Sequence, residues 1–354
     1  MTSERFKVLG AVSNPPNPFL NGALEWDGPP PEVELQVYDD VSRTILSRND
    51  SPDLPFTWSL NPYRGCMHAC AYCYARPTHE YLDFGAGTDF DRRIVVKRDA
   101  PALLHDAFMK RSWTGELLMF SGNTDCYQPL EATYGLTRAC LEVCRDFHNP
   151  VAIITKSCLI ERDLDVLVEL NRRTRLYVTV SLPFWDADNA RAIEPFVPTP
   201  RRRIKTIAAL AEAGLDVAVN VAPIIPGLND SDIPRILEAA RAAGARRAGH
   251  TLVRLPGPVA AVFDERLRKA LPLRAEKVLR RIAEAREEPG AHSTFHRRMV
   301  GAGRYWDAIS LLFRTTCARL GLATGATEIL VPTGAPATFR RPERGPKQLS
   351  LFDP

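Results

Sequence analysis

The stretch NPYRGCMHACAYCYAR at residues 61–76 places three of the chain's eight cysteines within eight positions. Gaps of three and two residues separate Cys66, Cys70 and Cys73, so we expect their thiols on one loop around a single metal centre. Three thiolates suit an iron–sulfur cluster that leaves one iron open to a ligand from outside the protein. Zinc held by the same cysteines and His68 is the alternative that this spacing leaves open.

After the cysteines, short apolar runs such as LLMF, VAII and YVTV alternate with amphipathic segments. Buried strands separated by helices indicate βαβ units and a parallel sheet. With a first strand just before Cys66, about six units are expected, fewer than a full eight-fold barrel has. The predicted fold class is α/β, a partial (β/α)6 TIM-type barrel with an irregular N-terminal and a helical C-terminal extension. The predicted parts are an extended lead-in (1–55), the barrel core (56–256), a basic extension with helices over 264–288 and 305–322 (257–335) and a disordered tail (336–354).

Unusual polar residues follow the predicted strands, where a barrel of this type holds its working residues. The first set is SGNTDC at 121–126, and Lys156 and Ser181 end the next two strands. These side chains are therefore expected to face one site together with the cysteine loop.

The segment CMHACAYC resembles the CxxxCxxC motif, with an aromatic residue before the last cysteine, of the radical S-adenosylmethionine superfamily. The resemblance implies that Cys66, Cys70 and Cys73 hold a [4Fe–4S] cluster whose open iron binds S-adenosylmethionine. Reductive cleavage of that cofactor then gives a 5′-deoxyadenosyl radical that abstracts hydrogen. The implied cofactor contacts are Tyr72 beside the adenine, Ser121, Asn123, Thr124 and Asp125 near the amino group, Lys156 at the carboxylate and Ser181 at the ribose.

Within the superfamily, NPYRGC, YCYAR, TDCYQPLE and ITKS resemble the spore photoproduct lyase-like group, related to DNA repair, over about residues 55–255. The resemblance offers Cys126 as a catalytic hydrogen donor, although a buried packing role is the alternative for this small side chain. Cys140 and Cys144 are one helical turn apart and are expected to pack on a helix.

Charge is distributed unevenly along the chain. Residues 235–354 hold 22 Lys and Arg against 11 Asp and Glu, whereas residues 1–234 hold 24 against 31. A basic C-terminal third favours a polyanionic partner such as a nucleic acid, although solvated helix faces would have the same composition. Tyr305 and Trp306 either stack on bases or anchor the last helix in the core. The basic residues expected nearest the barrel mouth or its adjoining helices are Arg246, Arg247, Arg297, Arg298 and Arg304.

The end of the chain, GPKQLSLFDP, contains a short apolar patch after a basic stretch. Its QLSLF resembles the pentapeptide by which bacterial polymerases and repair proteins bind the DNA polymerase sliding clamp. The resemblance predicts clamp binding, and packing on the protein's own body is the alternative. The residues concerned are Gln348, Leu349, Ser350, Leu351 and Phe352.

Together these features predict a radical S-adenosylmethionine enzyme that repairs or modifies DNA, with a reductant such as flavodoxin or ferredoxin as a further partner. One alternative is an enzyme that modifies RNA, and another is a non-catalytic iron–sulfur sensor recruited to the clamp. The first thirty residues do not read as a signal peptide, and no apolar run approaches the roughly 20 residues of a membrane span. We therefore expect a cytoplasmic protein with reduced cysteines and no membrane partner.

Overall fold

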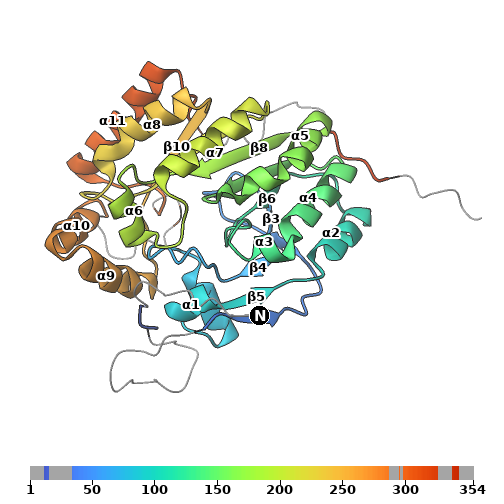
Figure 1. Ribbon diagram of the computed structural model, residues 1–354, viewed down its shortest axis with the longest axis horizontal. Helices are drawn as coiled ribbons and strands as arrows, with labels where there is room; N and C mark the ends of the chain where they lie inside the picture. Colours follow the sequence, from blue (N-terminus) through green and yellow to red (C-terminus); the bar gives the residue numbers. More distant parts are fainter. Residues whose placement is uncertain (1–11, 16–33, 287–294, 296–297, 326–336, 343–354) are drawn as a thin grey trace, which may run out of the picture.

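The computed structural model describes residues 12–15, 34–286, 295, 298–325 and 337–342 (Figure 1). Its main sheet has the strand order β10-β9-β8-β7-β6-β3-β2, parallel from β10 to β3 and antiparallel between β3 and β2. The predicted parallel core of six βα units, including a strand just before the cysteines, is confirmed. Its strands are β2 (Leu46–Arg48), β3 (Trp58–Leu60), β6 (Leu118–Phe120), β7 (Val151–Thr155), β8 (Leu176–Ser181), β9 (Val217–Ile224) and β10 (Arg247–Leu252).

The parallel strands are rich in Val and Ile because helices cover the sheet and both of its faces must exclude water. Ile153, Val178 and Val219 in three neighbouring strands are fully buried. They belong to one hydrophobic core that also includes residues of the covering helices. This core fixes the register of the strands, and thereby the positions at which their carboxyl ends meet.

A second, smaller sheet lies beside the main one. It has the order β1-β5-β4, from β1 (Gln36–Asp39), β4 (Tyr63–Arg64) and β5 (Arg93–Val96). Strand β4 directly precedes the cysteine loop, so this sheet holds the start of that loop. Only an extended lead-in was expected over residues 1–55. Strands β1 and β2 have four and three residues, too few for a recognisable alternation, and β1 pairs with β5, more than 50 residues further along the chain.

Helices surround the main sheet, and α11 packs on α8 at the β10 side (Figure 1). Cys140 and Cys144 are fully buried on α4, which confirms their predicted packing role. None of the helices in the described ranges is long and apolar enough to cross a membrane. The helices are α1 (Thr88–Arg92), α2 (Ala100–Met109), α3 (Glu131–Tyr134), α4 (Leu136–Asp146), α5 (Leu164–Arg173), α6 (Ala187–Ile193), α7 (Pro200–Glu212), α8 (Ile233–Ala242), α9 (Val259–Ala270), α10 (Pro272–Glu284) and α11 (Gly303–Leu320), with 3₁₀ helices at Arg76–Leu82, Cys158–Asp163 and Asp230–Asp232.

The C-terminal extension differs from its prediction in one respect. The single helix expected over 264–288 is two helices, α9 and α10, which break at Leu271. Pro272 has no N–H and disfavours helical geometry in the residue before it, and Leu271 accordingly has φ −135° and ψ 57°. The two helices pack on each other, so the proline converts one long helix into a hairpin.

The predicted disordered tail also differs from the structure in part. Residues 337–342 lie against the barrel, with the Arg340 N–H donating to the carbonyl of Phe147 at 2.9 Å. Residues 343–354, including the clamp-like segment 348–352, lie outside the described residues.

Replacement of Gly65 by alanine should destabilise the start of the cysteine loop. Gly65 has φ +80°, and a Cβ there would lie 2.8 Å from both the Phe90 carbonyl oxygen and His79 Cε1. Gly214 has the same φ with open space around it, which makes Gly214→Ala the matched control. Left-handed backbone costs an L-residue about 1–2 kcal/mol, so Gly214→Ala should lose that amount and Gly65→Ala clearly more. Urea unfolding measures both losses, and equal values would contradict the steric argument.

Candidate functional site

The cysteine loop follows β3 and β4 and crosses the carboxyl end of the main sheet. The Cys66 N–H donates to the Phe90 carbonyl at 3.0 Å, which fixes the loop's first thiol. Tight turns then close between the cysteines, since Ala69 N–H donates to Cys66 O and Cys73 N–H to Cys70 O, both at 3.2 Å. Ala69 adopts φ +55°, a left-handed conformation that lets the loop reverse within the three-residue gap.

Two buried side chains hold this loop from outside. The Arg76 guanidinium donates to the Cys70 carbonyl from Nε at 3.1 Å and from Nη2 at 3.0 Å, and it also pairs with Asp91 at 3.0 Å. The Gln128 amide accepts from the Met67 N–H and donates to the Gly65 carbonyl, each at 3.0 Å. The loop is thus fixed by hydrogen bonds to its main chain, which leaves the thiols available for other ligands.

The three thiols form a donor set that suits an iron–sulfur cluster. Cys66 and Cys70 are buried and Cys73 is half-buried, and all three are free of disulfides. Burial raises the pKa of each thiol, and the pKa of Cys66 is raised further by Asp125 and by the charges of Cys70 and Cys73. The thiols therefore lie close enough to influence one another. Bound iron would supply the positive charge that favours their thiolate forms.

The zinc alternative requires His68 to join the cysteines around one ion. His68 Nδ1 instead faces Asp125, at 3.4 Å from Oδ2. The described part of the chain contains no group of three or more His, Cys, Asp or Glu side chains that could hold a single metal ion. In a cluster each thiolate binds a different iron, so three sulfurs need not converge on one atom. With His68 facing Asp125, the three thiols are the donors that remain, and three thiolates suit a cluster.

Asp125, just after β6, connects the cysteine loop to two strands. Its Oδ1 accepts from the Thr155 hydroxyl at 2.7 Å and from the Tyr127 N–H at 3.0 Å, and its Oδ2 accepts from the Lys156 N–H at 2.8 Å. Burial alone would raise the pKa of Asp125, but His68 and these donors lower it to about 2. Both oxygens are therefore engaged within the protein, and in this structure Asp125 positions the site's neighbouring elements.

Tyr72, before the third cysteine, belongs to a buried chain of polar contacts. Its hydroxyl donates to Glu194, and Glu194 pairs with Arg203 at 2.5 Å. Arg203 in turn donates to the Ser181 carbonyl at 2.9 Å, which links the tyrosine to the end of β8. Burial and the Glu194 charge raise the pKa of Tyr72, so its phenol stays a hydrogen-bond donor. Tyr72 and Ser181 are thus brought to one region.

Lys156 extends from the end of β7 toward the cysteines. Its ammonium lies 5.8 Å from the centre of the Tyr72 ring, within cation–π range. Burial alone would lower the pKa of Lys156, but the charges of Cys70 and Glu194 raise it above its ordinary value. The lysine is therefore a fixed positive charge between the cysteine loop and the neighbouring strand ends.

The remaining residues of the SGNTD segment act in this structure mainly through contacts within the protein. Ser121 Oγ accepts from the Cys126 N–H at 2.9 Å, and Thr124 Oγ1 donates to the Tyr63 carbonyl at 2.8 Å. The N–H groups of Asn123 and Thr124 both donate to Asn61 Oδ1, at 2.9 and 3.2 Å. Asn61 was not predicted, although its place directly after β3 gives it the same strand-end position as the predicted residues.

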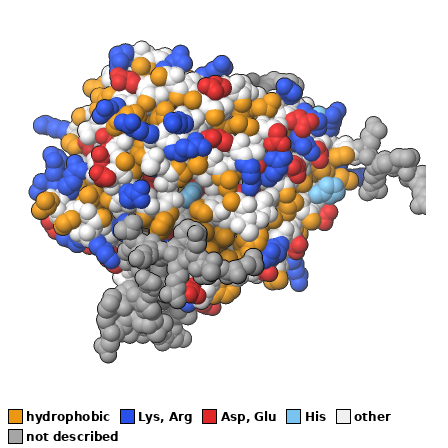
Figure 2. All heavy atoms as spheres, in the orientation of Figure 1, with side chains coloured by type: hydrophobic (Ala, Val, Ile, Leu, Met, Phe, Trp, Pro, Cys, Tyr) orange, Lys and Arg blue, Asp and Glu red, His pale blue; other side chains and the backbone are white. Residues whose placement is uncertain are grey.

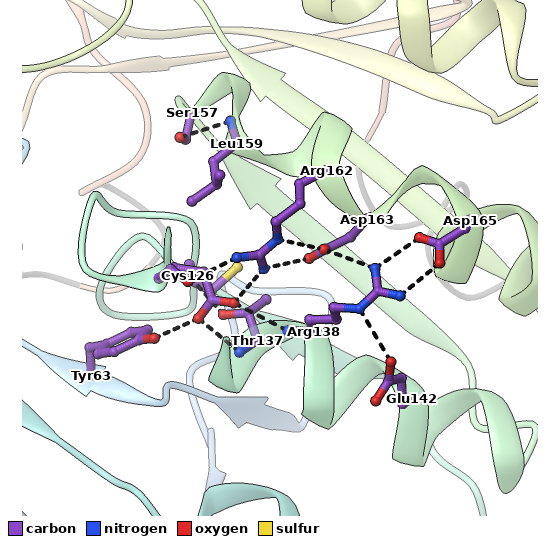
Figure 3. A network of polar contacts seen from close by, with 11 residues as sticks. Tyr63, Cys126, Thr137, Arg138, Glu142, Ser157, Leu159, Arg162, Asp163 and Asp165 are labelled. Carbon is purple, nitrogen blue, oxygen red and sulfur yellow. Dashed lines mark hydrogen bonds and ion pairs between the residues drawn. The ribbon is translucent and has the colours of Figure 1, made fainter. Parts of the chain in front are cut away.

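Cys126 lies beneath this segment rather than on its surface. The side chain is fully buried, and the Cys126 carbonyl accepts from the Thr137 hydroxyl at 2.6 Å (Figure 3). Burial, followed by the Asp125 charge, raises the pKa of its thiol. Figure 3 shows it beside a network of charged side chains that includes Arg162 and Asp163. The role of Cys126 as a hydrogen donor stays a prediction.

Tyr74, directly after the third cysteine, forms a basic rim with Arg254 and Arg298. The Tyr74 ring is 44% exposed, and the Arg254 guanidinium lies 4.9 Å from its centre. Arg254 follows β10, and Arg298 approaches from the segment before α11, where it pairs with Asp53 at 2.6 Å. Burial, followed by the charge of Arg298, lowers the pKa of Arg254. We name Tyr74, Arg254 and Arg298 the basic rim.

The predicted positions of the other basic residues need correction. Arg247 is the first residue of β10 and pairs with Asp216 at 2.9 Å, at the amino end of the sheet. Arg246 and Arg247 therefore do not lie at the mouth itself, because a strand presents only its carboxyl end there. They lie instead beside the chain that follows α11, where the Ala323 N–H donates to the Arg246 carbonyl at 3.0 Å. Arg297 lies outside the described residues, and Arg304 is exposed in the first turn of α11. Figure 2 shows Lys and Arg side chains gathered over the C-terminal helices, with acidic side chains interspersed.

Tyr305 and Trp306 of α11 both pack toward the core. Trp306 is 3% exposed and packs near His250, with ring centres 5.9 Å apart. Tyr305 donates its hydroxyl to Asp230 at 2.6 Å. The alternative that these residues anchor the last helix is confirmed for Trp306.

Comparison with known proteins identifies the family. The sequence profile of the radical SAM superfamily matches residues 60–240, and the chain belongs to this superfamily of enzymes. Its members use a [4Fe–4S] cluster and S-adenosylmethionine, which confirms the resemblance and the expected cofactors at the level of the superfamily.

The relatives found by sequence are similar to this chain over only part of their own length. An uncharacterized protein of Mycobacterium tuberculosis is 43% identical over 194 residues, which cover 54% of this chain and 57% of that protein. An uncharacterized protein of Methanocaldococcus jannaschii is 32% identical over 171 residues, or 48% of this chain and 61% of that protein. The chain thus matches little more than half the length of these curated relatives.

Solved structures show the same fold over most of the chain. Spore photoproduct lyase complexed with dinucleoside spore photoproduct is similar at a TM-score of 0.54 and 17% identity, covering 85% of this chain and 87% of that one. A mutant of that enzyme with bound AdoMet and the dinucleoside has the same TM-score at 16% identity. At this identity the comparison establishes the arrangement of the elements.

Replacement of Asp125 by asparagine should cost on the order of 2 kcal/mol at pH 7, because the carboxylate's pKa is about 2 in the folded chain against roughly 3.9 when unfolded. A carboxylate whose pKa is lower in the folded than in the unfolded chain stabilises the fold at pH values above its unfolded pKa. This contribution is lost as the pH falls through the folded pKa of about 2. The difference between wild type and Asp125→Asn should therefore be complete above pH 4 and shrink toward pH 2. Denaturant unfolding at several pH values measures it.

Asp165→Asn is the matched control, since Asp165 also has a pKa lowered to about 2 by Arg138 but its side chain is 64% exposed. Solvent screening should make its loss clearly smaller. A loss for Asp125→Asn that does not change with pH would contradict the role of the charge.

Proposed function

We propose that this protein is a radical SAM enzyme whose substrate is a nucleic acid, with repair or modification of DNA as its reaction. The observation that carries the choice of substrate is the basic rim beside the third cysteine. Nucleic acids are held by cations on their phosphates and by aromatic rings on their bases, and the rim offers both. The likeness of fold to spore photoproduct lyase supports the same substrate class.

In this proposal Cys66, Cys70 and Cys73 hold the [4Fe–4S] cluster, and S-adenosylmethionine lies between the cysteine loop and the ends of β6, β7 and β8. When bound, these two cofactors supply one-electron chemistry that generates a hydrogen-abstracting radical. Lys156 is the free cation for the cofactor's carboxylate, because within the described residues its ammonium has no ion pair. Tyr72, held by Glu194, offers its ring face to the adenine. Ser121, Asn123, Thr124 and Ser181 complete the proposed contacts, and Asp125 holds the main chain of Lys156 in place.

The exposed member of the basic rim is Tyr74, whereas Arg298 is paired with Asp53. Tyr74 donates its hydroxyl to the Gly122 carbonyl at 2.9 Å, so the exposed ring has a fixed orientation. Arg254 Nε is buried without a hydrogen-bond partner among the described residues, and burial of such a donor is unfavourable unless a ligand or water meets it. An anionic group at this position would satisfy the guanidinium next to the cluster loop.

The two alternatives make different use of the same residues. An RNA-modifying enzyme would share the basic rim, and only substrate competition separates it from a DNA enzyme. A non-catalytic sensor would retain the cysteines but would have no use for a lysine at the cofactor's carboxylate. The clamp partner stays a prediction, since residues 348–352 lie outside the described part of the chain.

Replacement of Lys156 by methionine should leave the cluster intact and reduce cleavage of S-adenosylmethionine at least tenfold, because the cofactor's carboxylate loses its cation, an interaction of about 1.5–3 kcal/mol. The measurement is 5′-deoxyadenosine formed by anaerobically reconstituted protein with dithionite, with the cluster followed by absorbance. Lys205→Met, an exposed lysine on α7, is the control. Undiminished product in Lys156→Met, or product from the triple Cys66/Cys70/Cys73→Ala variant, would overturn the assignment.

Replacement of Arg254 by alanine should weaken binding of a DNA duplex about tenfold and make the salt dependence of binding less steep, because one phosphate contact is lost. Arg173→Ala removes the same charge at the opposite end of the sheet, in the last turn of α5, and should have little effect. Titrations of DNA and of RNA of the same sequence give both affinities and compare the two substrate classes. Equal losses in the two variants would indicate only a general charge effect.

A further inference from the structure

Residues 337–342, named here the C-terminal strap, lie against the barrel although residues 326–336 before them are not described (Figure 1). Phe339 contacts the rings of Phe108 and Phe147, with centres 5.8 and 6.1 Å apart. Gly115 has φ +87°, and a Cβ on it would lie 2.2 Å from Phe339 Cβ. The surface under the phenylalanine therefore requires a glycine.

Arg341 of the strap closes the end of α2. Its Nε donates to the Phe108 carbonyl at 3.0 Å, and its Nη2 donates to those of Lys110 and Trp113 at 2.6 and 2.9 Å. The last carbonyls of a helix lack partners inside the helix and form the negative end of its dipole. The Arg341 guanidinium gives these carbonyls hydrogen-bond donors and places a positive charge at the negative end of the dipole, so the contact is specific to the helix end.

The strap also contacts the ends of helices α4 and α5. The Arg340 N–H donates to the carbonyl of Phe147, the residue that ends α4, at 2.9 Å. The Thr338 hydroxyl lies 2.6 Å from that of Thr174, the residue that ends α5, and also donates to the His148 carbonyl. The strap thus contacts the ends of three helices, α2, α4 and α5.

These contacts place the strap at the end of the sheet opposite the candidate site. The helix ends that it contacts lead into the amino ends of β6, β7 and β8, whereas the site residues follow the carboxyl ends of the same strands. Strand β8 has six residues and so separates the two ends by about 20 Å. The strap and the basic rim therefore lie on different faces of the molecule.

We propose that the C-terminal strap is an anchor that fixes the point from which residues 343–354 continue, on the face of the barrel opposite the candidate site. A protein that binds the chain next to the strap would then meet the face of the barrel opposite the mouth of the site. The anchor itself does not depend on the reaction at the site. Only its use by a clamp-like partner rests on the proposed function.

Amine cross-linking of the full chain tests the anchor. Lys347 is five residues beyond Pro342, a reach of at most about 18 Å, and Lys110 is an exposed residue at the strap's contact surface. A short bifunctional reagent should join Lys347 mainly to Lys110, as measured by mass spectrometry. Helices α9 and α10 lie on the other side of the molecule (Figure 1), so their Lys269 and Lys277 should form few links to Lys347.

Phe339→Ala should reduce the Lys347–Lys110 link at least fivefold. Arg341→Gln, which removes the helix-end contacts, should also reduce the link and replaces the first variant if that variant folds poorly. Leu311→Ala, at an exposed leucine of α11, is the control and should not change it. Equal link yields in wild type and both variants, or an equal link from Lys347 to Lys277 in wild type, would overturn the anchor. The readout needs neither cofactor nor nucleic acid, so its failure is distinct from failure of the proposed function.

Discussion

The carboxylate of Asp125 joins the cysteine loop to the sheet, and the geometry of the candidate site depends on this joint. It accepts hydrogen bonds from β7 residues on one side and faces His68 of the loop on the other. A buried carboxylate is stable only when such donors surround it, which is why its pKa falls to about 2 despite burial. Displacement of any one partner would leave a buried charge undersatisfied, so loop and strand ends are held in one arrangement.

The second constraint is a set of buried ion pairs on either side of the cysteines. Arg76 with Asp91 holds the loop's main chain, and Arg203 with Glu194 holds Tyr72 and the end of β8. Buried pairs of this kind add little net stability, because desolvation offsets their attraction, but removal of one partner is strongly unfavourable. Their effect here is to specify a single position for the loop, which a cofactor site requires.

The parallel sheet gives the molecule two chemically different ends. Its carboxyl ends carry the cysteine loop, Lys156 and the basic rim, and its amino ends carry the helix termini that the strap contacts. All six parallel strands point the same way, so the residues that follow the strands lie at one edge of the sheet and the residues that precede them lie at the opposite edge. The arrangement separates the candidate site from the C-terminal strap.

The sequence by itself determined the superfamily, the cofactor class and the parallel βα core, because these depend on local patterns: the spacing of Cys66, Cys70 and Cys73, and apolar runs that alternate with helices. It also placed Lys156 and Ser181 at strand ends. Only the tertiary structure showed that Glu194 and Arg203 hold Tyr72, since the tyrosine and its carboxylate are 122 residues apart. The same holds for Arg247, whose strand-end position depends on where β10 begins, and for the strap, whose partners are helix ends 164 or more residues earlier. Contacts of this range leave no periodicity or spacing in the chain, and the folded sheet alone brings them together.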